Sequence, residues 1–292
     1  MTDSASRRSA LIALAILSLI WSFNWIVMKS VLAYIGPLTF SALRYVFGTL
    51  VLFLVLRLRG EALAPTPWRD TILIGIAQTT GFQVLVQLAL VAGGAGRTAL
   101  LAYTMPFWVI PLAWLLLGDR PGWRQWLWMA LAAVGLLLVL EPWSGLGGAL
   151  SALLALAGGL CWAVGTVLAK RLFHTAAISP LRLTAWQMLV GTVGLVALAL
   201  IVRERAIEWS PLMYGALIYN GVLSSGLAWA LWLFVVQRLP ANVAGLASLV
   251  TPLLGVGFAW VLLGERPDAA ESVGIALIGI ALFGILRPRA TS

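Results

Sequence analysis

Long apolar runs follow one another along almost the whole chain and constrain its fold more than any other feature. Ten runs, each bounded by a charge, a Pro or a Gly, lie at about 9–29, 37–57, 70–92, 97–117, 124–141, 147–169, 180–202, 211–236, 242–262 and 270–287. Because a helix needs about 20 apolar residues to cross a bilayer, we expect an all-α membrane protein with ten transmembrane helices. Little of the 292-residue chain is then left for a soluble domain.

Other fold classes fit the sequence poorly. With 62% hydrophobic and 10% charged residues, the chain is far from the roughly half apolar and quarter charged composition of a soluble domain. A transmembrane barrel alternates apolar and polar residues, whereas residues 131–140 are continuously apolar. The first run continues through Trp21 and Trp25 without a small-residue cleavage site, so it predicts a membrane span rather than a secretory signal.

The distribution of Lys and Arg predicts the orientation. With a cytoplasmic N-terminus, 13 of the 19 basic residues fall on the cytoplasmic side and 5 on the other, as the positive-inside rule requires. We therefore expect both termini, with tails at 1–8 and 288–292, in the cytoplasm. The net charge of +9 is then a topology signal, and no basic domain indicates a nucleic-acid partner.

The chain contains an internal repeat. AWLLLGDRP at 113–121 recurs as AWVLLGERP at 259–267, an offset of 146 residues. Similar offsets pair further residues: Pro106 with Pro252, Gly75 with Gly221, Trp21 with Trp162, Arg44 with Gln187, and Gly48 with Gly191. We expect two five-helix repeats, at 9–141 and 147–287. Since five spans is an odd number, the second repeat enters the membrane from the opposite face, which is the inverted-repeat architecture of secondary transporters.

Polar side chains within the spans indicate faces that point at a cavity or at another helix, because unpaired polar groups are costly in hydrocarbon. Small Ser and Thr residues also serve helix packing, whereas the bulky amides of the third span favour a cavity. Helical spacing and the repeat give these candidate substrate-binding residues: Trp21, Asn24, Arg44, Gln78, Gln83, Tyr103, Trp108, Trp162, Trp186, Gln187, Ser224, Trp229 and Ser248. The tryptophans suit flat hydrophobic solutes through stacking, or organic cations.

Two prolines and one arginine stand inside spans. Pro106 and Pro252 each remove a backbone donor, and they mark either hinges or static kinks. Arg44 is the one charge well inside a span. Its partner is either a substrate carboxylate or a carbonyl of a broken helix, or else it snorkels to the interface or pairs locally to hold the repeat together.

The sequence offers little for catalysis or energy coupling. All ten acidic residues lie in loops, tails or span ends, and His174 lies in a loop, so a membrane-embedded carboxylate relay is not expected. This favours facilitated diffusion or exchange over proton coupling. With no P-loop motif and a single cysteine, Cys161, we expect no ATP site, no catalytic residues, no metal and no cofactor.

Two five-helix repeats, each closing on G-[DE]-R-P after a Pro-containing fourth helix, resemble the EamA family of the drug/metabolite transporter superfamily. The tryptophan-rich chain is similar to YddG-type exporters of aromatic amino acids. The resemblance implies a bacterial inner-membrane exporter, embedded in lipid, in which four helices of each repeat surround a central cavity and the fifth is peripheral. Its partner would be a small hydrophobic or aromatic amino acid or a related metabolite; the oligomeric state stays open.

Two other functions remain open. The first is export of cationic or aromatic drugs, for which smaller members of the superfamily use a membrane-embedded Glu that is absent here. The second is a channel or receptor, which saturation of flux and counterflow would separate from a carrier.

Overall fold

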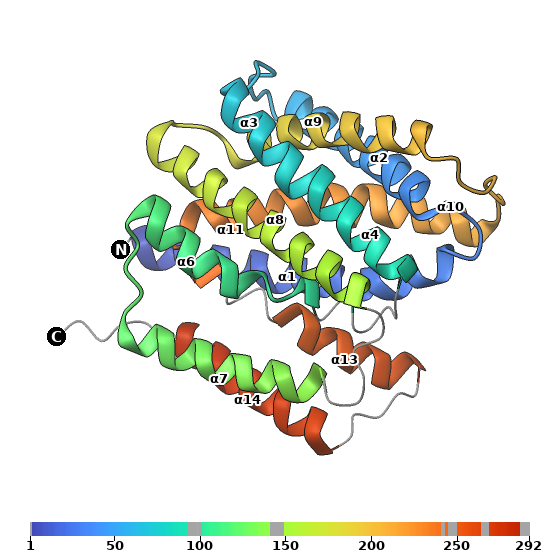
Figure 1. Cartoon of the computed structure of the whole chain (residues 1–292). Coiled ribbons are helices and arrows are strands. Elements are labelled where there is room, and N and C mark those ends of the chain that lie inside the picture. Colours follow the sequence, from blue (N-terminus) through green and yellow to red (C-terminus); the bar gives the residue numbers. More distant parts are fainter. Residues whose placement is uncertain are drawn as a thin grey trace.

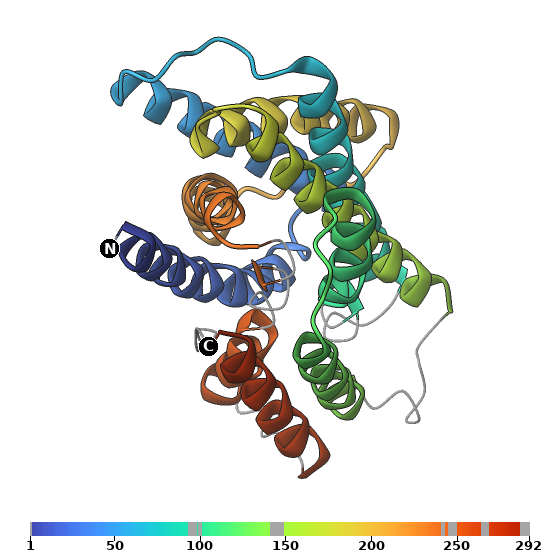
Figure 2. The same cartoon turned by 90° about the vertical axis from the view of Figure 1, so that its left-hand side faces the viewer.

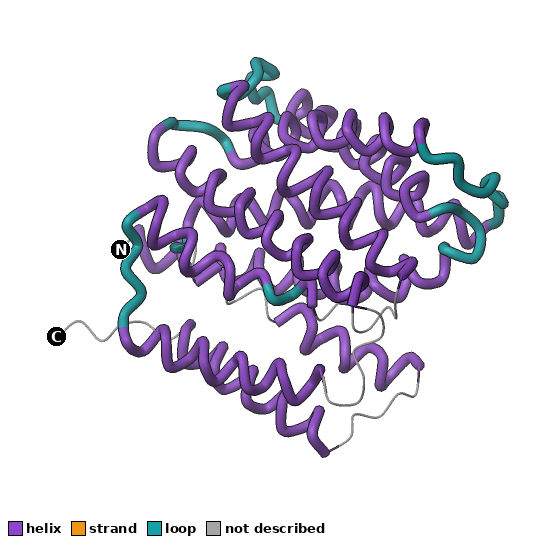
Figure 3. The backbone as a smooth tube through the Cα atoms, viewed as in Figure 1, coloured by secondary structure: helices purple, strands orange, loops and turns teal. Residues whose placement is uncertain are grey.

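The computed structural model describes residues 2–92, 98, 101–140, 149–240, 243–244, 250–263 and 269–286. These residues form helices and short connections, with no strand among them (Figures 1 and 3). Six helices are long and apolar enough to cross a membrane, at 6–28, 37–58, 68–91, 150–175, 180–201 and 211–238. Shorter apolar helices lie at 105–117, 123–138 and 272–281. The described part of the chain is thus all-helical, as expected, and its six long apolar helices are those of a membrane protein, while ten crossings and the inversion of the repeat stay predictions.

Each of the ten expected ranges contains a helix. In the first half these are α1 (Thr2–Val31), α2 (Pro37–Leu58), a continuous helix made of α3 (Trp68–Ile74), η1 (Gly75–Gly81) and α4 (Phe82–Ala92), then α6 (Met105–Leu117) and α7 (Trp123–Leu140). The second half has α8 (Ala149–Thr175), α9 (Pro180–Ile201), a continuous helix made of α10 (Pro211–Ile218), η3 (Tyr219–Leu227) and α11 (Ala228–Arg238), then α13 (Val250–Leu263) and α14 (Ala269–Leu286).

Two of these helices change their winding in the middle. Residues 75–81 of η1 and 219–227 of η3 are π-helical. A π turn disrupts the regular backbone ladder and is frequent at functional sites. The two π segments occupy corresponding places in the halves, because Gly75 and Gly221 are paired by the repeat. Nothing in the sequence analysis predicted them.

Local chemistry explains where several helices begin. α2, α9 and α10 each start with a proline, whose fixed φ and missing N–H suit the first turn. The Ser179 and Ser210 hydroxyls cap α9 and α10. For α2 the cap comes from a distant loop, since the Glu204 carboxylate accepts hydrogen bonds from the backbone N–H groups of Leu38 and Thr39 at 3.0 and 2.7 Å.

The structure places Pro106 differently from the sequence-based expectation. Pro106 lies in the first turn of α6 rather than in a helix interior, and Pro111 is the proline inside that helix. Pro252 is the third residue of α13, and residues 245–249 are not among those that the structure describes. At a first turn a proline costs no intrahelical hydrogen bond, so Pro106 does not kink α6.

Helices of the two halves pack against each other throughout. α2 packs on α9 and η3, η1 on α9, α4 and α6 on α8, and α1 on α11 and α13. Figures 1 and 2 show α7 and α14 side by side at one edge of the molecule, with α13 next to α14. Their contact is close, since a Cβ at Gly135 would lie 2.7 Å from the Gly274 carbonyl oxygen. The last helices of the two halves therefore form a pair at the periphery.

Candidate substrate cavity

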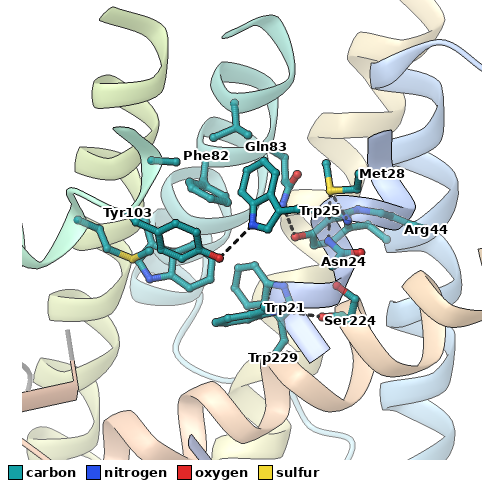
Figure 4. Close-up of a pocket in the computed structure, with 15 residues that line it drawn as sticks. Trp21, Asn24, Trp25, Met28, Arg44, Phe82, Gln83, Tyr103, Ser224 and Trp229 are labelled. Carbon is teal, nitrogen blue, oxygen red and sulfur yellow. Dashed lines mark hydrogen bonds between the residues drawn. The ribbon is translucent and has the colours of Figure 1, made fainter. Parts of the chain in front are cut away.

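A cavity lies between the two halves, where α1 contacts η3. It is narrow, with a volume of about 50 Å³, which is room for a few water molecules. Its walls come from α1, α2, α4, the start of α6, α8, η3 and α11 (Figure 4). The lining residues are Trp21, Asn24, Trp25, Met28, Arg44, Tyr45, Phe82, Gln83, Val86, Ala102, Tyr103, Met105, Trp162, Ser224 and Trp229.

Aromatic rings form one part of the wall. The Trp162 ring lies 5.2 Å from that of Trp21, 4.9 Å from that of Trp229 and 4.8 Å from that of Phe82, all between centroids. Trp232 lies behind these rings, buried and 5.6 Å from Trp162. Such edge and tilted contacts are favourable for aromatic side chains. These five residues are called the aromatic wall below, and the four that line the cavity offer faces and edges on which a flat solute can stack.

Two indole N–H groups form hydrogen bonds between segments of the cavity lining. Trp21 Nε1 donates to the carbonyl oxygen of Ser224 at 3.2 Å, within the π-helical segment η3. Trp25 Nε1 donates to the Tyr103 hydroxyl at 3.0 Å. The first contact ties α1 to η3, and the second ties it to the segment before α6, so α1 is held on two sides of the cavity.

Polar side chains gather at another part of the lining. Arg44 Nη1 donates to Asn220 Oδ1 at 2.7 Å and approaches Met28 Sδ at 3.5 Å. Asn24 Nδ2 donates to the same sulfur atom at 3.1 Å. Figure 4 shows Arg44, Asn24 and Met28 together on one side, with Phe82 and Tyr103 on the other. The cavity is therefore polar at one end and aromatic at the other.

Several buried polar atoms of the lining have no hydrogen-bond partner. Two are acceptors, Asn24 Oδ1 and Gln83 Oε1, and two are donors, Arg44 Nε and Trp162 Nε1. The Gln83 amide is oriented by its N–H group, since Nε2 donates to the Tyr45 hydroxyl at 2.7 Å. Buried polar groups are normally satisfied, so unpaired donors and acceptors on residues that line one cavity favour a polar occupant.

The structure brings most of the sequence-based candidates together. Trp21, Asn24, Arg44, Gln83, Tyr103, Trp162, Ser224 and Trp229 all line the cavity. Arg44 is buried, with 3% of its surface exposed, so it does not snorkel to the membrane interface. Its hydrogen-bond partner is the side chain of Asn220 in η3 and not a backbone carbonyl.

Four further candidates lie elsewhere, and one is not described. Gln78 donates to Thr166 at 3.1 Å in the contact between η1 and α8, and Gln187 accepts from Thr79 at 2.8 Å. Trp186 stacks edge-on against Phe53 and Trp68 and donates to the carbonyl of Leu63. Trp108 is 37% exposed. Ser248 lies outside the described residues.

Sequence reasoning missed some of the lining. Trp25 and Met28 follow Trp21 at helical spacing, so the face of α1 could have been extended to them. Tyr45 and Phe82 are aromatic residues in apolar helices, and nothing in their spacing marks them as cavity residues. Each is only the sequence neighbour of a polar candidate, Arg44 or Gln83. Among the described residues, no three His, Cys, Asp or Glu side chains come together as metal ligands would.

Lys170 lies near the C-terminal end of α8 and is buried. Its ammonium group donates to the carbonyl oxygens of Gln237 and Leu239 at 3.2 and 2.8 Å. These carbonyls belong to the end of α11, where a cation is favourable. Lys170 therefore closes the C-terminus of a neighbouring helix and does not reach the cavity lining.

Comparisons with known proteins agree with this architecture. A model of the EamA-like transporter family matches residues 8–141 and 149–287. The chain is 27% identical over 275 residues to the uncharacterized transporter YoaV of Bacillus subtilis, covering 91% of this chain and 92% of the relative. It is 25% identical over 292 residues to a probable amino-acid metabolite efflux pump of Salmonella typhimurium, covering 95% and 94%. A crystal structure with 22% sequence identity shares the fold, with a TM-score of 0.81 over 95% of this chain and 98% of the other.

Proposed function

Because this chain belongs to the EamA-like transporter family, we propose that it exports hydrophobic, chiefly aromatic, amino acids across the bacterial inner membrane. The observation that carries this proposal is the aromatic wall beside a polar end in one cavity. The ring of an aromatic amino acid can stack on the aromatic wall while its charged groups meet the polar end. The efflux-pump name of the Salmonella relative points to the same class of solute.

The proposed mechanism is alternating access between two inverted five-helix repeats. It is supported by the packing, in which each contact between halves has a counterpart when the halves are exchanged. When the halves are exchanged, α1 corresponds to α8, α2 to α9, η1 to η3, α4 to α11 and α6 to α13. The contact of α4 with α8 is then matched by that of α11 with α1, and the contact of α6 with α8 by that of α13 with α1. The contact of η1 with α9 is matched by that of η3 with α2. An approximate two-fold relation of this kind is how inverted-repeat carriers build a site at the repeat interface.

Glycines repeat this relation in detail. A Cβ at Gly75 would lie 2.5 Å from the Gln187 carbonyl oxygen, and a Cβ at Gly48 would lie 2.7 Å from Ser225 Cβ. At Gly221 a Cβ would lie 2.6 Å from Phe47 Cβ. α9 therefore approaches η1, and α2 approaches η3, at paired positions where a side chain does not fit.

The cavity lies in one half of the proposed membrane span. Its lining on α1 begins at Trp21 and ends at Met28, whereas Leu14 and Leu17 are buried in the core. With the N-terminus in the cytoplasm, the cavity faces away from the cytoplasm and the aromatic wall closes the cytoplasmic side. This conformation is the one from which an exporter releases its solute.

The described lining contains no Asp, Glu or His, which favours facilitated diffusion or exchange as the energetic mode. The same absence of carboxylates argues against the competing function, export of cationic drugs. A carrier for cations places a carboxylate in its site, whereas the charge at this cavity is the cationic Arg44. The amino acid is therefore the favoured solute.

Counterflow in proteoliposomes tests the proposal. Vesicles loaded with unlabelled phenylalanine should transiently accumulate labelled phenylalanine, and the rate should saturate and ignore an imposed pH gradient. Vesicles without protein set the background. Transport restricted to organic cations, or a flux that neither saturates nor shows counterflow, would overturn the proposed function.

A matched pair of variants ties the transport to this cavity. Trp162→Leu removes a ring of the aromatic wall, whereas Trp186→Leu removes one that packs on Trp68 outside it. A lost aromatic contact is worth about 0.5–1.5 kcal/mol, which corresponds to roughly a 2- to 12-fold increase in KM. That increase is expected for Trp162→Leu alone, and equal kinetics of the two variants would place the solute elsewhere.

A further inference from the structure

Arg44 is a buried cation that faces the cavity without an anion. Its guanidinium is always charged, only 3% of its surface is exposed, and no carboxylate among the described residues pairs with it. Its partners are the neutral Asn220 amide oxygen, the Met28 sulfur and the face of Tyr45, 5.0 Å from the ring centroid. A buried charge is costly unless an opposite charge compensates it.

The unpartnered atoms of the cavity-lining residues indicate what would compensate this charge. Arg44 Nε and Trp162 Nε1 are donors without an acceptor, and Asn24 Oδ1 and Gln83 Oε1 are acceptors without a donor. All four residues line the cavity, and each is at least nine-tenths buried. An α-amino acid carries a carboxylate, which needs donors, and an ammonium group, which needs acceptors, on neighbouring atoms.

We infer that Arg44 binds the α-carboxylate of the transported solute and that the amide oxygens of Asn24 and Gln83 receive its α-ammonium group. This inference rests on the proposed function, and it assigns the polar end of the cavity to the part that all α-amino acids share. The side chain of the solute then extends toward Phe82 and the aromatic wall, opposite Arg44 (Figure 4). A free carboxylate is thus the feature by which the site selects its solute.

The equivalent position of the other half argues against a purely structural role. Gln187, which the repeat pairs with Arg44, accepts a hydrogen bond from Thr79 and holds α9 against η1. An amide is therefore sufficient for that helix contact. The charge is present only on the copy that lines the cavity, where a solute can reach it.

Solute analogues test the inference on the unchanged protein. In the counterflow assay, phenylalanine, phenylalanine amide, phenethylamine and 3-phenylpropanoate compete with labelled phenylalanine. A charge-assisted hydrogen bond is about twice as strong as a neutral one, so loss of the carboxylate should weaken competition by roughly 10- to 100-fold. 3-Phenylpropanoate, which keeps the carboxylate and loses the ammonium group, should compete better than phenethylamine, which does the reverse.

Variants then assign the selectivity to Arg44. Arg44→Gln introduces the residue found at the paired position, Gln187. In this variant phenylalanine amide should compete almost as well as phenylalanine, a competition ratio close to one, whereas Arg44→Lys should keep part of the preference for phenylalanine. Arg238→Gln is the control, because this arginine stacks on Phe234 at a helix end outside the cavity; it should leave the ratio unchanged.

The possible outcomes separate the two proposals. If the wild-type protein does not transport or bind phenylalanine at all, the proposed function fails. If phenylalanine is transported but its amide and phenethylamine compete as well as it does, the role of Arg44 is overturned while the function stands. An unchanged ratio in Arg44→Gln would overturn the role in the same way, and the analogue series gives an answer even if that variant does not fold.

Discussion

The close approach of α9 to η1 gives a sharp prediction about a single methyl group. Gly191 faces η1, and a Cβ there would lie 2.2 Å from Thr79 Cβ and 2.8 Å from the Gly75 carbonyl oxygen. Carbon atoms in contact are about 3.5–4.0 Å apart. Neither opposing atom can rotate away, because one is a Cβ and the other belongs to the backbone. In Gly191→Ala the two helices must therefore separate.

The magnitude follows from what this separation disturbs. Overpacking costs about 1–3 kcal/mol. The hydrogen bonds from Thr79 to Gln187 at 2.8 Å and from Thr80 to the Gly191 carbonyl at 2.9 Å cross the same contact, and each contributes about 0.5–1.5 kcal/mol. Alanine gains about 0.5–1 kcal/mol over glycine in a helix. The net change expected is a loss of about 1–3 kcal/mol in the free energy of unfolding.

Thermal unfolding in detergent, at one scan rate for all variants, measures this loss. Gly215→Ala is the matched control, because a Cβ at Gly215 in α10 would meet nothing within 4 Å. Gly191→Ala should lower the midpoint by about 2–6 °C, given about 2 °C per kcal/mol for a chain of this size, and Gly215→Ala should leave it equal or higher. A Gly191→Ala midpoint at or above that of the wild type would refute the close packing of α9 on η1.

Three further substitutions probe the contacts that hold the cavity in place. Lys170→Met removes the bonds to the Gln237 and Leu239 carbonyls, and it should lower the unfolding midpoint by a few degrees, corresponding to about 1–3 kcal/mol, while Lys170→Arg recovers part of the loss. Glu204→Ala removes the cap of α2 and should cost about 0.5–2 kcal/mol in the same assay; a midpoint unchanged from wild type would contradict the cap. Trp21→Phe keeps a ring but loses its hydrogen bond to η3, so solute counterflow should slow while phenylalanine amide stays a poor competitor.

Hydrophobic runs, charge and the repeat were enough to predict the helical membrane fold. Those signals are periodic and extend over many residues, so each helix is indicated by about 20 positions. Helical spacing from Trp21 likewise predicted the α1 face of the cavity, of which Trp21 and Asn24 are part. Polar residues within apolar helices were a good guide because few such residues occur without a partner.

Contacts between helices were the part that the sequence could not supply. Gln78 and Gln83 lie on the same continuous helix and look alike in the sequence, yet Gln83 lines the cavity and Gln78 meets Thr166 on α8. In a regular helix, five positions at 100° each point the two side chains about 140° apart, so they face different neighbours. Both were expected at the cavity because bulky amides are poor packing residues, but Gln78 is buried against α8, and the sequence does not show which helix lies on each side.

The relation between the halves also explains how a single cavity can have two unlike ends. Arg44 at the polar end is paired by the repeat with Gln187, and Gln83 in the lining corresponds, at the offset of 146, to Trp229 in the aromatic wall. Gln83 and Trp229 both line the cavity, so the difference between them makes its two ends unlike. Gln187, the counterpart of Arg44, lies outside the lining and bonds Thr79, so the charge is present at one end only. On the proposed function, a solute with one charged end and one ring needs these different ends, and divergence between the halves allows the site to bind it in one orientation.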